Sequence, residues 1–386
     1  MLDMIAHHFP SGAATAARDP RHIVVTPYES VDVLYIDESA YVGQSGPSLA
    51  EIRAAVASTP FRLHIAKLED AFEVTNDVAW MAQLDDVSLP VVPSTSQASA
   101  QDRLLSFLAT EMHSATSIST LHAALVHTLL RYHAKRLGCE ILFTGETATR
   151  LAVKCVSGIA QGRGYAIGEE IAASWNSGDG LDGYIMISRP MSALLSKEVA
   201  YYLRFKNISN GSSVEGRAAR LPAKSAGVEA LVEEFIVGLD AEFPSTVPTI
   251  LRTSQKLGMR SAAKNTQTHV CPVCGLPSQQ GAWNWRYAIT ISKFDQPAQT
   301  ALGTSAADDS LGKDDNRDLK LTPLLCYSCL LVMQNPKGPP REHSALRLMP
   351  LPRHVYGVII RNQEEAANPM DRLRKEIDDF LIEDDV

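Results

Sequence analysis

The sequence predicts an α/β fold built on a parallel sheet, followed by a module held together by four cysteines. Short apolar runs alternate with longer amphipathic stretches over the first two hundred residues. Strands that alternate with crossover helices are typical of a parallel sheet. Two Cys-x-x-Cys pairs, which lie in the last third of the chain, predict the second unit.

The expected sheet is read from the period of the apolar residues. Strands are predicted at 22–26, 31–36, 61–65, 140–143 and 184–188, and helices at 48–58, 118–135, 147–160 and 191–206. The helix at 118–135 is supported by Ile118, Leu121, Leu125 and Leu129, which recur at helical spacing. Gly145 lies between a predicted strand and a helix. Such turns form the sheet edge where α/β folds bind ligands.

Four consecutive units follow from these patterns. Residues 1–206 form the α/β domain, and residues 207–267 form a Ser-, Gly- and Ala-rich linker followed by helices at 228–240 and 248–264. The cysteine module spans 268–335, and its polar insertion at 296–318 is expected to be disordered. Residues 336–386 supply a strand at 355–360 and an acidic helix that begins at Pro369.

Composition and charge exclude several classes of protein. The chain has 386 residues, of which 45% are hydrophobic and 21% charged, as in ordinary globular proteins. It contains neither an apolar run long enough to cross a membrane nor a secretory signal at its start. A net charge of -8 means that any nucleic-acid contact must come from a local basic patch. Six cysteines, four of them in close pairs, suit a reducing compartment, so a cytosolic location is expected.

The two cysteine pairs predict a structural Zn²⁺ site. Cys271, Cys274, Cys326 and Cys329 would supply four thiolates, two from each tight turn. The spacing suits a zinc-ribbon-like module in which residues 285–294 form one arm of a hairpin. An iron–sulfur cluster would use the same ligands. Alternatively, the two pairs are unrelated, or the cysteines are reduced residues of the core. A redox role is disfavoured, because redox Cys-x-x-Cys pairs usually lie at the start of a helix that follows a strand.

Several segments together resemble one known family. They are residues 63–72, the Thr-Gly-Glu-Thr-Ala-Thr-Arg stretch within 142–154, residues 162–164, residues 188–200 and both cysteine pairs. The resemblance is to the family called cytoplasmic tRNA 2-thiolation protein 2. It implies a degenerate PP-loop ATP-pyrophosphatase fold, similar to the adenine nucleotide alpha-hydrolases.

The resemblance also implies a role and a set of partners. Such a chain pairs with a catalytic sister subunit that binds ATP, activates the wobble uridine of tRNA and receives sulfur from a ubiquitin-like carrier. The complex 2-thiolates cytosolic tRNAs of the Lys, Glu and Gln type. The chain itself would bind tRNA, stabilise the sister subunit, or do both.

The chain departs from the active members of this fold at three places. It lacks the Ser-Gly-Gly-x-Asp-Ser loop that binds pyrophosphate at a helix N-terminus. Residues 145–150 lack the expected aspartates, and residues 116–120 lack the expected cysteine pair. Residues 1–9 resemble the middle of the first helix, so the first strand and its loop are expected to be missing. These losses predict that the chain alone binds no ATP and catalyses no reaction.

Two groups of basic residues are candidates for tRNA contact. Arg252, Lys256, Arg260 and Lys264 recur every four residues and would form one stripe on a helix, suited to phosphates. The second group, at the expected ligand edge of the sheet, consists of Arg150, Lys154, Arg163 and Arg189. A solvated surface face is the alternative for the stripe, and salt bridging is the alternative for the second group.

Two rival functions remain open at this stage. One is an active ATP-dependent tRNA-modifying enzyme whose full-length form carries the missing loop. The other is a zinc-ribbon interaction protein unrelated to tRNA, which would purify without tRNA-modifying partners.

Overall fold

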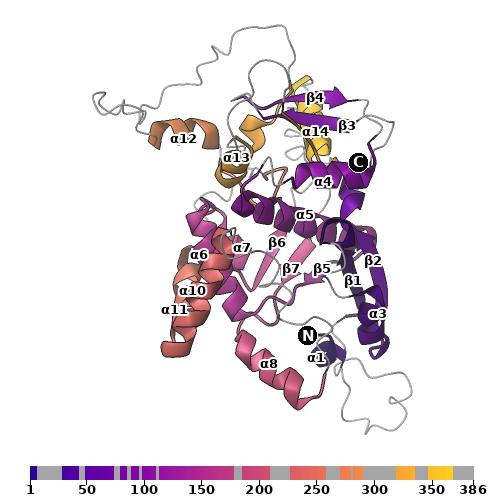
Figure 1. Ribbon diagram of the computed structural model, residues 1–386, viewed down its shortest axis with the longest axis vertical. Helices are drawn as coiled ribbons and strands as arrows, with labels where there is room; N and C mark the ends of the chain where they lie inside the picture. Colours follow the sequence, from indigo (N-terminus) through magenta and orange to yellow (C-terminus); the bar gives the residue numbers. More distant parts are fainter. Residues whose placement is uncertain are drawn as a thin grey trace, which may run out of the picture.

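The computed structural model describes residues 1–6, 28–42, 48–73, 79–84, 88–94, 98–109, 113–177, 185–208, 227–257, 270–279, 281–289, 319–334 and 347–367. Helix α5 (Ala115–Arg136) crosses the middle of the molecule (Figure 1). Two small sheets, each with one parallel strand pair, lie on one side of it, and an antiparallel sheet with its own helices lies on the other. The architecture is therefore mixed α/β.

The expected parallel strand pairs are present. Strand β1 (Asp32–Asp37) runs parallel to β2 (Arg62–Lys67), and β5 (Ile141–Phe143) runs parallel to β7 (Ile185–Ser188). Strand β6 (Ser174–Ser177), which the sequence did not predict, pairs with β7 in the antiparallel direction. The strand predicted at 22–26 lies outside the described residues.

Helices join and cover these strands. They are α1 (Leu2–Ala6), α2 (Ser39–Val42), α3 (Leu49–Ala57), α6 (Ala148–Ala160), α7 (Ile167–Ile171) and α8 (Ser196–Phe205). Helix α3 begins at a capping box, because the Ser48 hydroxyl accepts from the Glu51 amide and the Glu51 carboxylate accepts from the Ser48 amide. Helix α8 begins five residues later than predicted, since Met191 and Leu194 form a turn instead.

A helical pair covers α6 on its outer side. It consists of α10 (Val228–Glu242) and α11 (Thr246–Ser254), and a 3-10 turn, η5 (Gln255–Leu257), continues α11. Ile236, Val247 and Leu251 from this pair share a core with the apolar face of α6. The helix predicted at 248–264 is described only as far as Leu257, and most of the predicted linker lies outside the described residues.

The four-stranded antiparallel sheet was not predicted from the sequence. Its order is β8-β4-β3-β9, formed by β3 (Ala79–Gln83), β4 (Pro90–Ser94), β8 (Leu319–Lys320) and β9 (Leu348–Pro350). Helices α4 (Ala100–Phe107), α12 (Ala282–Ile289), α13 (Tyr327–Gln334) and α14 (Arg353–Ala367) lie around it with the turns η3 (Leu68–Phe72) and η6 (Thr322–Leu324).

Two predictions about this region were wrong. The hairpin arm expected at 285–294 is replaced, as far as Ile289, by helix α12. The strand expected at 355–360 lies within helix α14, where Val355 and Ile359 are buried one helical turn apart. The β-branched run suggested a strand, but burial at i and i+4 is the pattern of a helix that covers a core. The acidic helix predicted from Pro369 lies outside the described residues.

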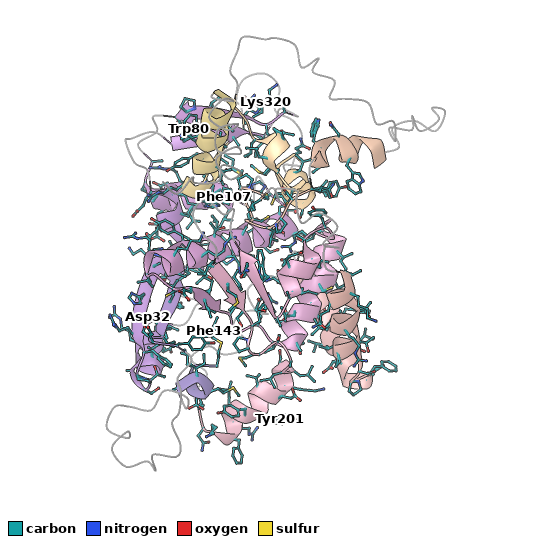
Figure 2. All side chains as sticks on the ribbon, turned by 180° about the vertical axis from the view of Figure 1, so that it is seen from behind. Asp32, Trp80, Phe107, Phe143, Tyr201 and Lys320 are labelled. Atoms are coloured by element: carbon teal, nitrogen blue, oxygen red, sulfur yellow. The ribbon has the colours of Figure 1, made fainter. Side chains whose placement is uncertain are left out.

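One hydrophobic core joins the cysteine segments to the first part of the chain. It contains Phe72 and Phe107, whose ring centroids are 5.3 Å apart, together with Leu121 of α5, Leu330 of α13 and Met349 of β9. Phe107 is labelled in Figure 2. The buried cysteines 271, 274 and 329 belong to the same core. None of the helices in the described ranges is long and apolar enough to cross a membrane.

This shared core predicts a large effect of truncation at Phe107. Phe107→Ala should lower the free energy of unfolding by about 3–5 kcal/mol, because a ring that is 1% exposed leaves a cavity. Leu105→Ala on the same helix is the control, since Leu105 is 41% exposed and should cost far less. Urea denaturation would compare the two, and equal losses would contradict the assignment of Phe107 to the core.

Candidate metal centre and the adjoining polar cavity

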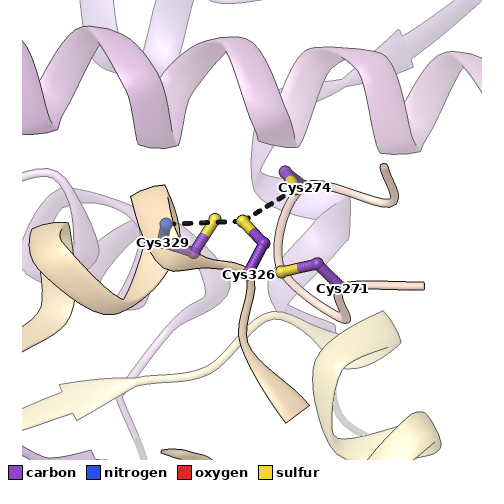
Figure 3. Close-up of side chains that lie close together, drawn as sticks. All are labelled: Cys271, Cys274, Cys326 and Cys329. Atoms are coloured by element: carbon purple, nitrogen blue, oxygen red, sulfur yellow. Dashed lines mark hydrogen bonds between the residues drawn. The ribbon is translucent and has the colours of Figure 1, made fainter. Parts of the chain in front are cut away.

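Four cysteines from two distant segments meet at one point (Figure 3). The Sγ atoms of Cys271, Cys274, Cys326 and Cys329 all lie within 4.8 Å of one another. Cys326 is half-buried and the other three are buried. The structure therefore brings together all four ligands that the sequence predicts.

The first pair lies on a tight turn. The Gly275 amide donates to the Cys271 carbonyl at 2.8 Å, and the Cys271 amide donates to the Leu276 carbonyl at 2.9 Å. Gly275 has φ +66°, in the left-handed region that favours glycine. This reversal aims both thiols toward the second pair.

The second pair lies at the start of a helix. Cys326 immediately precedes α13, and its carbonyl accepts from the Leu330 amide at 2.9 Å. The Cys329 amide donates to the Cys326 sulfur at 3.5 Å. Amide groups at a helix N-terminus stabilise negative charge, so this position supports the thiolates of a metal-bound cluster.

The cysteine cluster fits a single tetrahedral metal ion. Thiolates at metal–sulfur distances of about 2.3 Å lie about 3.8 Å apart at the corners of a tetrahedron. The Sγ atoms of Cys274 and Cys326 are 3.8 Å apart. The four cysteines can therefore hold a metal ion with little rearrangement.

The thiols also shift one another's ionisation. Hydrogen bonds with Cys271 and Cys326 raise the pKa of Cys274 well above its ordinary value. Hydrogen bonds with the other three thiols do the same to the pKa of Cys329. Four thiolates cannot share this buried volume without a cation, so metal binding must displace protons from the cluster.

A polar cavity of about 60 Å³ adjoins the metal centre. Both cysteine pairs contribute to its wall, through Cys274 and Cys329. Most of the remaining wall comes from α5, α6, α7, β6, β7 and the turns beside them, including His127, Lys154, Arg163, Glu170, Trp175 and Arg189. The cavity thus lies where the cysteine segments meet the α/β part of the chain.

A partly buried ion triad joins the turns that follow β5 and β7. Glu146 accepts from Lys154 Nζ at 2.7 Å and from Arg189 Nε at 2.6 Å. The Arg189 side chain is only 3% exposed. Burial raises the pKa of Glu146, but the charges of Lys154 and Arg189 outweigh it and hold this pKa well below its ordinary range. The positive charge of Lys154, together with burial, lowers the pKa of His127 to about 3, so His127 is neutral at physiological pH.

The other two basic residues of this edge also pair with carboxylates. Arg150 of α6 pairs with Glu229 and Glu233 of α10, and Arg163 pairs with Glu170 of α7 at 2.9 Å. Each of the four candidates at the expected ligand edge therefore has an intramolecular acidic partner. This agrees with the alternative that these residues form salt bridges rather than contact tRNA.

The candidate basic stripe is described in part. Arg252 on α11 and Lys256 on η5 are both exposed, one turn apart. Arg260 and Lys264 lie outside the described residues.

Sequence reasoning missed the acidic members of these sites. Glu146 lies inside the strand–turn–helix segment that was singled out, and its place shortly before the basic candidates Arg150 and Lys154 was the available signal. Glu170 and His127 carry no comparable local pattern, because their roles depend on contacts between helices.

Removing the central carboxylate of the triad should destabilise the protein. Glu146→Gln leaves Lys154 and Arg189 without a counter-charge, which should cost about 3–5 kcal/mol at pH 7. Because the folded-state pKa of Glu146 is depressed, this contribution is complete above the unfolded value of about 4.3 and is lost as pH falls below it. Urea unfolding of both proteins at pH 7 and pH 3.5 should therefore show a smaller difference at pH 3.5.

A surface ion pair provides the control for this prediction. Lys197→Met breaks the pair between Lys197 and Asp240, in which the Lys197 side chain is 45% exposed. It should cost at most about 1 kcal/mol. A pH-independent effect of Glu146→Gln, or one no larger than that of Lys197→Met, would contradict the triad's role.

The cysteine cluster predicts one metal ion per chain. Cys326→Ser should lose the metal, because a serine hydroxyl is not ionised at neutral pH, whereas Cys139→Ser outside the cluster should retain it. Elemental analysis of the purified proteins measures both. Wild-type protein without stoichiometric metal and without cluster absorbance would refute the site.

Comparisons with known proteins agree with the expected family. A family model described as Cytoplasmic tRNA 2-thiolation protein 2 matches residues 227–331. Proteins of that description from Bos taurus and Rattus norvegicus are similar to the chain. The first is 31% identical over 268 residues, or 58% of this chain and 51% of the relative. The second is 26% identical over 421 residues, or 92% of this chain and 75% of the relative.

A solved structure of the U34-tRNA thiolase from Methanococcus maripaludis with its 4Fe-4S cluster was also matched. It covers 59% of this chain and 62% of that one at 10% identity, with a TM-score of 0.37, which is too low to bear on the fold. The chain spans about half the length of the first curated relatives it matches. The family model and the relatives nevertheless confirm the resemblance that the residues predict: this chain is similar to the cytoplasmic tRNA 2-thiolation protein 2 family.

Proposed function

We propose that this chain is a non-catalytic subunit of a complex that 2-thiolates the wobble uridine of cytosolic tRNAs. It would bind tRNA, stabilise a catalytic sister subunit, or do both, in the cytoplasm. The sister subunit would bind ATP and receive sulfur from a ubiquitin-like carrier. The similarity to proteins named Cytoplasmic tRNA 2-thiolation protein 2 supports the tRNA part of this proposal.

The ion triad around Glu146 supports the non-catalytic part. In α/β folds a ligand binds in the crevice beyond the carboxyl ends of the strands. In this chain a carboxylate of the protein itself lies there between Lys154 and Arg189. Its negative charge would repel a nucleotide phosphate. Lys154 and Arg189, the two cations that could bind such a phosphate, are already paired with this carboxylate. This arrangement suits a degenerate PP-loop ATP-pyrophosphatase-like domain that no longer handles ATP.

The metal centre is proposed to hold structural Zn²⁺. Four thiolates within 4.8 Å of one another suit a single ion. In a 4Fe-4S cluster each thiolate binds a different iron, which requires a wider set of sulfurs. A closed set of four protein ligands leaves no open position for a substrate, so the metal would stabilise the fold rather than catalyse a reaction.

Deletion and complementation in the native source would test the proposed role. Loss of the chain should abolish wobble-uridine 2-thiolation, and restoring it should recover both the modification and co-purification of the sister subunit. The purified chain alone should not adenylate tRNA. Normal thiolation in its absence, or adenylation by the isolated chain, would refute the proposal.

The basic stripe, whose described members Arg252 and Lys256 are exposed, is proposed to contact tRNA phosphates. Changing Arg252, Lys256, Arg260 and Lys264 to Ala in the complex should weaken binding to every tRNA alike. Each lost phosphate contact removes a slope of roughly 0.7–0.9 in log affinity against log salt, so the slope should fall by about three.

The control for the stripe removes charge elsewhere. Arg252→Ala with Lys256→Ala should reduce the slope by roughly 1.4–1.8. Arg53→Ala with Arg62→Ala removes the same net charge from exposed positions on α3 and β2 and should leave the slope unchanged. Filter binding at several salt concentrations would measure the slopes, and an unchanged slope in the quadruple variant would exclude the stripe.

A further inference from the structure

Two arginines from the α/β part of the chain approach the cysteine centre. Arg131 lies on α5, and Arg163 lies in the turn between α6 and α7. Neither belongs to the segments that carry the cysteines. Their placement links the metal centre to helices distant from it in sequence.

Arg131 packs directly against the first cysteine turn. Its Nη1 donates to the Gly275 carbonyl at 2.8 Å. A Cβ atom added to Gly275 would lie 1.7 Å from Arg131 Nη2, so the guanidinium fills the space where a side chain would be. Because the Gly275 amide also holds the Cys271 carbonyl, Arg131 supports the turn that aims both thiolates.

Arg163 adjoins the centre at the polar cavity. It lines the polar cavity together with Cys274 and Cys329, and its side chain is only 14% exposed. One of its nitrogens donates to Glu170 at 2.9 Å, whereas its buried Nε has no hydrogen-bond partner among the described residues. Burial lowers the pKa of Arg163, but the negative charges of Glu170, Cys274 and Cys329 outweigh this and raise it.

The charge of the metal-bound cysteine cluster gives a reason for two arginines to lie beside it. Four thiolates around one divalent ion carry a net charge of about -2. A buried charge of this size is costly unless it is balanced by neighbouring groups. Arg131 and Arg163 are two permanent cations at the wall of this centre, and arginine does not lose its charge in proteins.

We propose that Arg131 and Arg163 are second-sphere groups of the metal centre. They balance the charge of the four thiolates and thereby couple metal binding to the docking of residues 270–279 and 319–334 on helices α5, α6 and α7. This inference rests on the proposed metal site. Under this proposal, metal binding stabilises the contact between the cysteine segments and helices α5, α6 and α7. The adjoining cavity also depends on the metal, because Cys274 and Cys329 form part of the cavity wall.

Zinc release from the full chain tests the proposal. Loss of a second-sphere partner typically lowers metal affinity by about 10–100-fold. Arg163→Met should therefore speed zinc transfer to a chromogenic chelator by a comparable factor. Arg163→Lys, which restores the charge, should recover part of the loss. In Co²⁺-loaded protein, Arg163→Met should also shift the sulfur-to-metal absorption bands, which a purely structural role would leave in place.

Two controls separate charge balance from simple salt bridging. Arg150→Met removes an arginine that pairs with two glutamates but does not line the cavity, so zinc release should match wild type. Glu170→Gln breaks the ion pair of Arg163 but leaves its guanidinium beside the thiolates, and it should retain zinc. Wild-type release rates and spectra in folded Arg163→Met, or equal effects of Arg163→Met and Glu170→Gln, would overturn the proposal.

Hydrogen exchange of the unmodified chain gives a test that does not depend on a variant folding. Removing zinc should speed exchange in residues 161–167, the turn that carries Arg163, as well as in the cysteine turns. Faster exchange confined to the cysteine turns would refute the coupling. If the wild-type chain binds no zinc at all, the proposed metal site itself fails, which is a distinct outcome.

Discussion

The convergence of four thiols is the constraint on which the rest of this structure depends. Cys271 and Cys274 are distant in sequence from Cys326 and Cys329, yet the four sulfurs lie together in the core. The segment that carries the second pair also places β8 against β4 and Cys326, at the start of α13, against Cys274. Without a cation the cluster retains protons, so its packing and its charge are satisfied together only when metal is bound.

The features predictable from sequence were those with local causes. The long helix at 118–135, the parallel strands at 31–36 and 61–65, and the cysteine ligands each follow from a period or a spacing within a few residues. The antiparallel sheet was not predictable, because Met81 pairs with Pro350 and Val91 with Leu319. Strands of two to five residues carry too little alternation to be recognised. A strand was wrongly predicted at 355–360 because β-branched residues favour strands. The segment is helical, and its contact with the core stabilises the helix.

The candidate site was predictable to a similar extent. The basic residues near the expected ligand edge were found because they follow predicted strands and helices, and Lys154 and Arg189 do converge. Their shared partner, Glu146, depends on two turns that meet only in the folded sheet. The positions of Arg131 and Arg163 beside the thiolates follow from the packing of helices, which no local pattern encodes.

The pairing of β9 with β3 bears on how the protein is made. Residues 79–83 leave the ribosome long before residues 348–350, which complete their sheet. The shared core, which includes Phe107 and Leu121, cannot close until Met349 has been synthesised. Domains usually fold as units while the chain emerges, N-terminal part first. Helices α4 and α5 must therefore keep an apolar face uncovered during synthesis, and the newly made chain requires protection from aggregation until β9 is available.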